Sequence, residues 1–253
     1  MTELTELSEE LIEVIPDELD ILFQDEHYVA IYKPAGLLVH RSWIAKEATQ
    51  FAMQILRDQL GHYVYPVHRL DRPTSGVLVM ATSSEAARKL SEQFSTHTIY
   101  KQYLAVVRGY IEGVHDLDYP LKEKLDKMVD AKAQQDKPAQ SAFTQYKGLQ
   151  LAELDYPSGK FATSRYSLLS LEPKTGRKHQ LRRHMHHLSH HIIGDTTYGD
   201  GKHNRLFKQL GHPGLWLISK QLGFVQPYTQ QQILIDCPLP QRWKSLFQLM
   251  SWN

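Results

Sequence analysis

The sequence predicts an α+β fold with a central mixed or antiparallel sheet. Three observations support this prediction: strand-like apolar runs occur as apparent hairpins, helical segments are interspersed among them, and no internal repeat or low-complexity tract is present. A chain of 253 residues, 42% hydrophobic and 23% charged, is typical of a globular protein that buries a substantial core. Its length fits one large domain or two small ones.

The first half of the chain contains predicted strands and helices with clear boundaries. Residues 21–32 predict a β-hairpin, because two apolar runs flank a short polar stretch. Residues 48–61 have helical apolar spacing and end on a glycine, a typical helix stop. A second helix begins at a capping serine, Ser83 or Ser84, and runs to about His97. The other expected elements are a turn that returns to an extended run within 33–40, a buried strand over 75–81 and an alternating strand over 101–110.

The second half begins with a segment of weaker pattern. Residues 115–163 are polar and mixed in charge, so we expect an exposed insertion that is partly helical and mobile. Regular elements then return. The expected ones are a strand over 164–173, a turn over 174–176, a helix over 179–191, a strand over 192–201 that enters a glycine-rich loop, strands over 215–224 and 231–237, and a closing helix over 241–250.

Charge is distributed unevenly along the chain. Residues 1–20 contain eight acidic residues and no Lys or Arg, and their apolar spacing favours a short helix that Pro16 would end. Without this extension the body has 29 basic and 20 acidic residues, an excess of nine positive charges. Such a body is suited to a polyanion such as nucleic acid. The alternative is a solubilising tail on an ordinary surface.

Cysteine content and hydropathy indicate the compartment. The single cysteine, Cys237, excludes an internal disulfide framework and any metal site that needs two cysteines. A reducing, cytoplasmic setting fits this usage best. No apolar run is long enough for a membrane span. The acidic N-terminus has no basic region and no apolar core, so it does not resemble a signal peptide.

The first candidate for chemistry is Asp71 in "HRLDRPTSG", residues 68–76. Its carboxylate stands between Arg69 and Arg72 in the sequence, and nearby cations favour its ionised form. The turn residues that follow place it on a loop at the end of a strand, where reactive groups often lie. An ionised aspartate can act as a nucleophile or base at a sugar or heterocycle. A plain surface ion pair is the alternative, and such pairs are common and weak.

A second candidate is a cation-rich segment, here named the basic block, residues 173–194. Its lysines and arginines are Lys174, Arg177, Lys178, Arg182 and Arg183. Six of the chain's fourteen histidines also lie in it: His179, His184, His186, His187, His190 and His191. A cationic turn followed by a helix N-terminus can hold phosphates, because helix amides add to the side-chain charge. Pairing of the two adjacent arginines with acids at a sheet edge is the alternative.

Metal and nucleotide motifs are weak. His186 with His190, and His187 with His191, have the spacing of helical zinc ligands, but no HExxH glutamate and no nearby cysteine accompanies them. Histidines that cap, stack or touch phosphate explain this cluster as well, so no metal is expected. "GDTTYGDG" lacks the GxGxxG and GK[ST] patterns. We therefore expect no cofactor.

The ordered set of motifs resembles one family, the RluA-type pseudouridine synthases. "HRLDRPTSGVLVMA" is similar to the signature around the family's catalytic aspartate, and "KPAGLLVH" resembles its earlier Lys-Pro-Gly segment. "YKQYLAVVRG" resembles its Lys-x-Tyr-x-Ala strand. "EPKTGRKHQLRRHMHHLSHHIIGDTTYGD" resembles its Gly-Arg-x-His-Gln-Leu-Arg-x-His and Ile-x-Gly-Asp-x-x-Tyr-Gly motifs. The segments stand in the family order, and the resemblance runs from about residue 20 to residue 237.

The resemblance implies roles for individual residues. Asp71 matches the carboxylate that starts cleavage of the uridine N-glycosidic bond, after which the uracil rotates and rejoins through carbon. Tyr103 matches the family tyrosine that packs on the uracil, and Arg182 matches the arginine that pairs with the aspartate. Arg69 matches the arginine that enters the RNA stack where the target base has flipped out. The residues expected to contact RNA are His68, Arg69, Arg72, Lys174, Arg177, Lys178 and Arg183.

The resemblance also implies an organisation and a substrate. We expect an acidic extension over 1–20, a pseudouridine synthase catalytic domain over 21–253, and no separate N-terminal RNA-binding domain of the kind many relatives carry. RNA contacts would then come from the catalytic domain, with the 115–163 insertion and the basic block supplying them. The motifs are most similar to family members that modify uridine 65 of tRNA. Ribosomal RNA and a non-catalytic RNA-binding role are the alternatives. No membrane and no protein partner are implied, and a monomer is expected.

Overall fold

The computed structural model describes residues 13–41, 49–123, 138–157 and 160–252. The strands in these residues are β1 (Ile21–Gln24), β2 (Tyr28–Lys33), β3 (Tyr65–Pro66), β4 (Ser75–Ala81), β5 (Tyr100–Arg108), β6 (Val114–Asp118), β7 (Phe143–Leu154), β8 (Ser164–Pro173), β9 (Leu217–Val225) and β10 (Gln232–Asp236). The helices are α1 (Ala52–Leu60), α2 (Ser84–Ser95), α3 (Gln180–His187), α4 (Gly201–Gln209) and α5 (Gln241–Met250).

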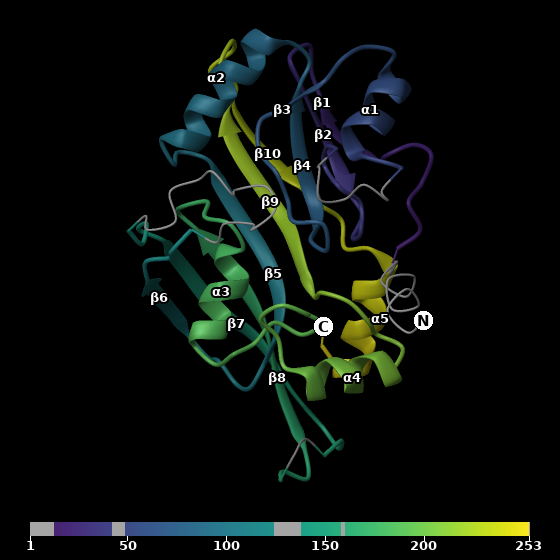
Figure 1. Cartoon of the computed structure of the whole chain (residues 1–253), viewed down its shortest axis with the longest axis vertical. Coiled ribbons are helices and arrows are strands. Elements are labelled where there is room, and N and C mark those ends of the chain that lie inside the picture. The colour runs from purple at the N-terminus through teal and green to yellow at the C-terminus, as the bar shows by residue number, and fades with distance from the viewer. Residues whose placement is uncertain (1–12, 42–48, 124–137, 158–159, 253) are drawn as a thin grey trace.

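These strands form one mixed sheet with the order β1-β2-β4-β9-β5-β8-β7-β6, while β10 pairs with β9 and β3 pairs with β4. The β4–β9 pair is parallel, and the other named strand pairs are antiparallel. Helices α1 and α2 lie at the β3–β4 end of the molecule, α3 lies against the β6–β8 part, and α4 and α5 lie at the end opposite α1 and α2 (Figure 1). The predicted α+β class with a mixed sheet is confirmed.

Strand β4 is a continuous apolar run because both of its faces are buried. Its seven residues, "SGVLVMA", are all buried. Because side chains alternate across a strand, Val77 and Val79 enter the core cluster around Trp216, whereas Leu78 and Met80 enter a second cluster on the other face. The sheet is therefore covered on both faces at this strand, and the residue just before β4 lies at a rigid position.

Several predicted boundaries are confirmed. The hairpin over 21–32 forms as β1 and β2. Helix α1 ends at Gly61, which has a left-handed φ of 74°. Helix α2 has Ser83 as its N-cap, whose hydroxyl accepts a hydrogen bond from the Ala86 N–H at 3.2 Å. The predicted strands over 75–81, 101–110, 164–173, 215–224 and 231–237 and the closing helix correspond to β4, β5, β8, β9, β10 and α5.

Other expectations are wrong or fall partly outside the described residues. In the described parts of 115–163 the regular elements are strands β6 and β7, and β7 pairs with β8 over ten residue positions. Residues 124–137, most of the polar stretch expected to be partly helical, lie outside the described residues. Residues 192–201 were expected to form a strand, but they contribute a single bridge, between Ile192 and Val107, and then turn into α4. The turn expected early in 33–40 forms at residues 35–36, but the extended run after it contributes a single bridge, at Leu38. Helix α4 lacked a sequence prediction, because its apolar spacing follows a glycine-rich loop.

The acidic extension is described from residue 13 onward, and its predicted helix over residues 4–12 lies outside the described residues. Leu19 is buried, and its backbone N–H and C=O bond the Gln59 side chain at 2.9 and 3.1 Å. The Glu13 carboxylate accepts a hydrogen bond from the Tyr32 hydroxyl at 2.7 Å and lies 3.6 Å from the Arg242 guanidinium of α5. Residues 13–20 therefore pack on the body. Across the part of the chain that the structure describes, none of the helices has the length and apolar character of a membrane span.

Candidate active site

Asp71 lies in a tight turn that leads directly into β4, here named the Asp71 turn, residues 71–74. The Thr74 N–H donates to the Asp71 carbonyl at 3.0 Å, which closes the turn. Two residues later the chain passes Ser219 of β9 at close range. Gly76 has a φ of 109°, and a Cβ at that position would lie 2.2 Å from the Ser219 carbonyl oxygen. Only glycine allows this approach, and it fixes where the turn leaves the sheet.

Lys33 holds the backbone of the Asp71 turn through a hydrogen bond to the Arg72 carbonyl. This lysine is fully buried, and its Nζ donates to the carbonyls of Pro34, Leu37 and Arg72 at 2.9, 2.9 and 3.2 Å. The Arg72 carbonyl also accepts from the Gly36 N–H at 2.8 Å. Burial lowers the pKa of Lys33 to about 7, although the nearby carboxylates oppose that shift. The "KPAG" segment thus holds the backbone next to Asp71.

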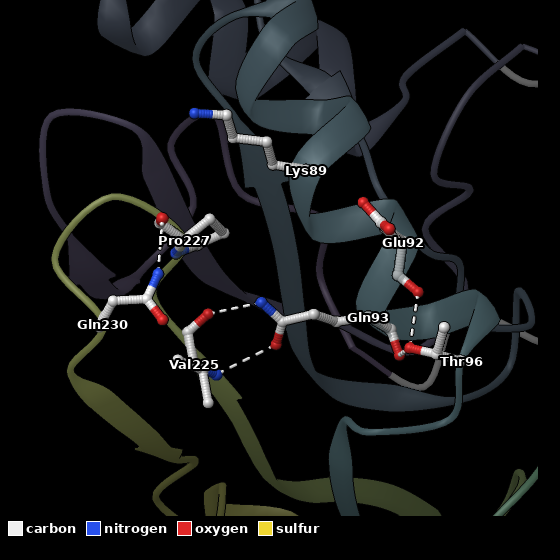
Figure 2. Close-up of a pocket in the computed structure, with 7 residues that line it drawn as sticks. All are labelled: Lys89, Glu92, Gln93, Thr96, Val225, Pro227 and Gln230. Atoms are coloured by element: carbon white, nitrogen blue, oxygen red, sulfur yellow. Dashed lines mark hydrogen bonds between the residues drawn. The ribbon is translucent and has the colours of Figure 1, made fainter.

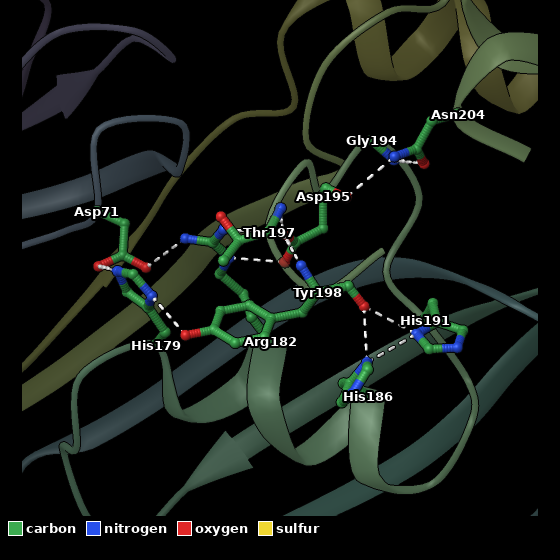
Figure 3. A network of polar contacts seen from close by, with 10 residues as sticks. All are labelled: Asp71, His179, Arg182, His186, His191, Gly194, Asp195, Thr197, Tyr198 and Asn204. Carbon is green, nitrogen blue, oxygen red and sulfur yellow. Dashed lines mark hydrogen bonds and ion pairs between the residues drawn. The ribbon is translucent and has the colours of Figure 1, made fainter. Parts of the chain in front are cut away.

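The side chain of Asp71 meets two groups from the basic block (Figure 3). Arg182 Nη1 lies 3.3 Å from Asp71 Oδ2, and His179 Nε2 lies 3.7 Å from Asp71 Oδ1. Arg182 and Asp71 are 111 positions apart in the chain. Helix α3 brings them together, because His179 is its N-cap residue and Arg182 lies in its first turn. The pairing of Arg182 with Asp71 agrees with the role that the family resemblance implied.

The expectation that the sequence neighbours hold the charge of Asp71 is wrong. Among the described residues, neither Arg69 nor Arg72 forms a hydrogen bond or ion pair with Asp71. The Arg72 Nε instead donates to the Gly36 carbonyl at 3.0 Å. Arg69 is exposed to solvent. Neighbouring side chains on a turn point in different directions, so Arg69 and Arg72 do not contact Asp71 although they are close to it in sequence.

Arg182 is itself held by a buried carboxylate. Its Nε and Nη2 donate to the two oxygens of Asp195 at 2.7 and 2.8 Å, a bidentate pair in which both side chains are almost fully buried. Asp195 also accepts from the backbone N–H groups of Thr197 and Tyr198, each at 2.9 Å. Burial alone would raise the pKa of Asp195, but the hydrogen bonds and charge of Arg182 outweigh it and lower that pKa. Arg182 is therefore a fixed cation.

Tyr103 lies on β5, close enough to Asp71 for the charge of that carboxylate to act on its hydroxyl. It stands opposite Ser219 in the antiparallel pairing of β5 with β9. Burial raises the pKa of Tyr103 to about 12, and the negative charge of Asp71 adds to the effect. The phenol is therefore neutral near physiological pH. Tyr103 packs against two neighbouring hydrophobic clusters, one around Leu78 and Met80 of β4 and the other around Ala105 and Val107 of its own strand.

The residues expected to contact RNA fall into two groups. Lys174 and Lys178 are exposed in the loop before α3, although Lys174 also lies 3.3 Å from Glu172. Arg177 is half-buried, and its Nε donates to the Ser141 carbonyl at 2.9 Å. Arg183 is half-buried on α3. These four residues share the segment that carries the contacts to Asp71.

His68 belongs to a different environment. Its Nε2 accepts a hydrogen bond from the Val79 N–H of β4 at 2.9 Å, and its ring stacks on Phe94 of α2 at 4.8 Å between centroids. Burial lowers the pKa of His68 to about 3, so the ring is uncharged. These contacts give His68 a packing role that needs no RNA.

The histidines of α3 and the following loop are occupied by protein contacts. His184 meets the Thr144 hydroxyl at 2.9 Å, and His187 stacks on Tyr119 at 3.6 Å. His186 and His191 lie 2.9 and 2.8 Å from the Tyr198 carbonyl oxygen. No group of three or more potential metal ligands forms among the described residues.

Sequence reasoning missed four residues of this site. Lys33, His179, Asp195 and Tyr198 all lie within segments quoted for the family resemblance, but no role was assigned to them. His179 was counted only as one of many histidines in the basic block. Asp195 and Tyr198 stand in "GDTTYGD", which resembles the family's Ile-x-Gly-Asp-x-x-Tyr-Gly motif as a whole but carried no role for either residue. Their spacing from Arg182 carried no local signal, because the contacts arise from the turn after α3.

A separate hollow lies between α2 and the turn that joins β9 to β10 (Figure 2). It has a volume of about 370 Å³. Gln93 crosses it and bonds both backbone groups of Val225, at 2.6 and 3.1 Å. The lining residues are Lys89, Glu92, Gln93, Thr96, Val225, Pro227 and Gln230. None of them is hydrogen-bonded to Asp71, His179 or Arg182, so this hollow is distinct from the candidate active site.

Comparison with known proteins places these features in context. Residues 27–187 match a family model described as RNA pseudouridylate synthase. The tRNA pseudouridine synthase C of Vibrio cholerae is 55% identical over 236 residues, which cover 93% of this chain and 97% of that protein. The protein of the same name from Haemophilus ducreyi is 55% identical over 237 residues, with coverage of 93% and 97%. That from Salmonella typhi is 48% identical over 236 residues, with coverage of 93% and 91%.

Solved structures show the same fold. Human RNA pseudouridylate synthase domain containing 4 superimposes with a TM-score of 0.69 at 26% identity, over 92% of this chain and 93% of that chain. Human RNA pseudouridylate synthase domain containing 1 gives a TM-score of 0.69 at 21% identity, over 96% and 98% of the two chains.

Proposed function

This chain belongs to the RNA pseudouridylate synthase family, and we infer that it is an isomerase that converts a uridine of tRNA to pseudouridine. One observation assigns this activity to a site: the half-buried Asp71 carboxylate contacts Arg182, which lies 111 positions later in the chain. The ribosomal RNA alternative is not favoured, because the similar proteins from three bacteria are named for tRNA. Uridine and pseudouridine are isomers, so the net reaction calls for no redox partner or group donor.

Asp71 is the proposed catalytic residue. Its carboxylate starts cleavage of the bond between uracil N1 and the ribose, and the freed uracil rotates and rejoins the ribose through C5. The Arg182 guanidinium lies 3.3 Å from one oxygen of the carboxylate, faces its negative charge and fixes its direction. Tyr103 packs against the uracil face, and its high pKa leaves it a neutral ring rather than a base. The C5 proton is then released to solvent and N1 takes up a proton, which completes the isomer.

The target base must leave the RNA stack before Asp71 can reach it. Arg69 is suited to fill the gap, because its side chain is exposed two residues before Asp71 and a planar guanidinium stacks on bases. Phosphate contacts are assigned to cations around the same turn and helix. They are Arg72, Lys174, Arg177, Lys178 and Arg183. His68 is assigned an indirect role in RNA binding, because it holds β4, the strand that follows Asp71.

The finer substrate assignment is uridine 65 of tRNA, which rests on the similarity of "LVHRSW", "VHRLDRPTSGVL" and "LEPKTGRKHQLRRH" to enzymes of that specificity. Residues 21–253 are the proposed catalytic domain, which we expect to act as a monomer. A cytoplasmic location is part of the same proposal, supported by the buried free thiol of Cys237.

The test is to incubate the purified protein with unmodified tRNA and, separately, with unmodified ribosomal RNA, and to map every pseudouridine formed. The expected result is a single modified position in tRNA, uridine 65, and none in ribosomal RNA. Modification of another tRNA uridine would reject the position alone. Modification confined to ribosomal RNA would reject the substrate, and binding without modification of either would reject the enzyme.

A further inference from the structure

Asp71 has two oxygens, and Arg182 contacts only one of them. The other, Oδ1, faces the Nε2 of His179 at 3.7 Å. This distance is too long for a hydrogen bond and short enough for an electrostatic contact. Contacts of catalytic carboxylates commonly tighten when substrate is bound. The far side of the His179 ring is also occupied, because Nδ1 lies 3.1 Å from the Tyr198 hydroxyl.

These contacts close a ring of side chains (Figure 3). Asp71 meets Arg182, Arg182 is bound by Asp195, and Asp195 accepts the backbone N–H of Tyr198. The Tyr198 hydroxyl then meets His179, which returns to Asp71. One buried carboxylate, Asp195, therefore sets the position of both groups that face Asp71.

The ring also fixes which nitrogen of His179 carries a proton. If Nε2 carried no proton, its lone pair would point at the Asp71 carboxylate and the two would repel each other. An Nε2–H group is instead attracted to the carboxylate. In that tautomer Nδ1 is an acceptor, and the Tyr198 hydroxyl is placed to donate to it. Burial lowers the pKa of His179, with Asp71 opposing the shift, so the neutral ring is the main form at neutral pH.

The backbone at His179 is strained in the manner of functional positions. Its φ is 55°, in the left-handed region, and its side chain does not cap α3 although it is the N-cap residue. A histidine is free to leave this conformation unless its surroundings hold it. Here the side chain is held between the Tyr198 ring, 5.7 Å away between centroids, and Asp71.

We propose that His179 is a positioning residue for the isomerisation: its Nε2–H, directed by the Tyr198 hydroxyl, holds Oδ1 of Asp71 while Arg182 holds Oδ2. Two contacts on opposite oxygens stop the carboxylate from rotating and aim it at the substrate. The inference rests on the proposed function, because it needs Asp71 to be the reacting group. His179 does not itself contact the reacting bond.

Protonation of His179 would disturb this arrangement. An imidazolium would pair tightly with Asp71, and its Nδ1–H could no longer accept from Tyr198. The charged groups around His179 are Asp71, Arg182, Asp195 and Lys178. Arg182 and Lys178 both disfavour the charged form of His179. The activity of the native protein should therefore fall only at pH values below the ordinary pKa of histidine.

The experiment is single-turnover release of tritium from uracil C5 of labelled tRNA, measured against pH. His179→Asn tolerates the left-handed φ but is too short to reach both partners, so it should react about 100-fold more slowly, the cost of a misplaced reacting group. His179→Gln retains an N–H donor at a similar reach, so it should recover most of that loss. Neither variant should change tRNA affinity. His62→Ala removes an exposed histidine that lies outside the basic block, and it should match the native rate.

The pH profile distinguishes positioning from mere packing. In Tyr198→Phe the donor to neutral Nδ1 is lost, which raises the pKa of His179, so the acid limb of the rate should move to higher pH. In His179→Gln that limb should be absent. The proposal fails if His179→Asn reacts at the native rate, or if the limb is unchanged in both other variants. A native protein without activity, or an active Asp71→Asn variant, would instead reject the proposed function.

Discussion

Replacing Arg182 with methionine separates the two carboxylates that its guanidinium serves. Asp195 loses a bidentate partner at 2.7 and 2.8 Å, while Asp71 loses a single contact at 3.3 Å. Asp195 is 2% exposed and keeps only backbone N–H donors. Removing one partner of a buried ion pair costs about 3–5 kcal/mol of unfolding free energy. We expect Arg182→Met to be destabilised by about that amount.

The loss should depend on pH in a defined direction. The pKa of Asp195 is lowered in the native protein from its ordinary value of 3.8. Its contribution to stability is therefore present above 3.8 and is lost as pH falls through the lowered native pKa. The difference in unfolding free energy between native protein and Arg182→Met should be constant near neutrality and shrink in acid.

A double variant separates stability from catalysis. Arg182→Met with Asp195→Asn removes the uncompensated buried charge, so urea unfolding should show most of the stability restored. Tritium release should stay about 100- to 1,000-fold below native in both variants, as when a fixed electrostatic donor is removed from an active site. Recovery of activity together with stability would refute the reasoning, because Arg182 would then act only through Asp195.

Three further predictions concern the surroundings of Asp71. Ser219→Ala shortens the side chain that stands opposite Tyr103 in the β5–β9 pairing, and the single-turnover rate should fall by less than about tenfold, the size of one neutral hydrogen bond; a loss as large as that of Arg182→Met would contradict a packing role for the ring. The lowered pKa of Lys33 means that the unfolded chain binds more protons between about 7 and 10.5, so native stability should rise with pH over that range, by up to about 1.4 kcal/mol per pH unit. Lys33→Met should remove that component of the slope in urea titrations, and an unchanged slope would show that the ammonium titrates normally. Lys174→Ala and Arg183→Ala should each weaken tRNA binding and lower the slope of log Kd against log salt by about one, whereas equal slopes would exclude phosphate contacts there.

The sequence allowed much of the fold to be predicted because its local signals were strong. The run "SGVLVMA" and the capping Ser83 act within a few residues, and β4 and α2 appear as expected. Polar composition misled in 115–163, where β7 alternates exposed and buried residues at the edge region of the sheet. A strand with one solvated face can be as polar as a loop, and its pairing with β8 is a long-range property.

The site was predictable only in part for the same reason. The family resemblance identified Asp71, Tyr103 and Arg182, and the structure brings Asp71 and Arg182 into contact. Local charge pointed to the wrong cations, because the partners of Asp71 come from a helix more than one hundred positions away. Asp195 gave no signal in sequence, since its importance lies in a buried pairing that the turn after α3 creates.

The most direct measurement is single-turnover tritium release from tRNA by the Asp71→Asn variant, with tRNA binding measured in parallel. The substitution keeps the size of the side chain and removes the negative charge that Arg182 holds. The account predicts no release above background while tRNA still binds. Release at the native rate would show that the carboxylate of Asp71 is not the group that breaks the glycosidic bond.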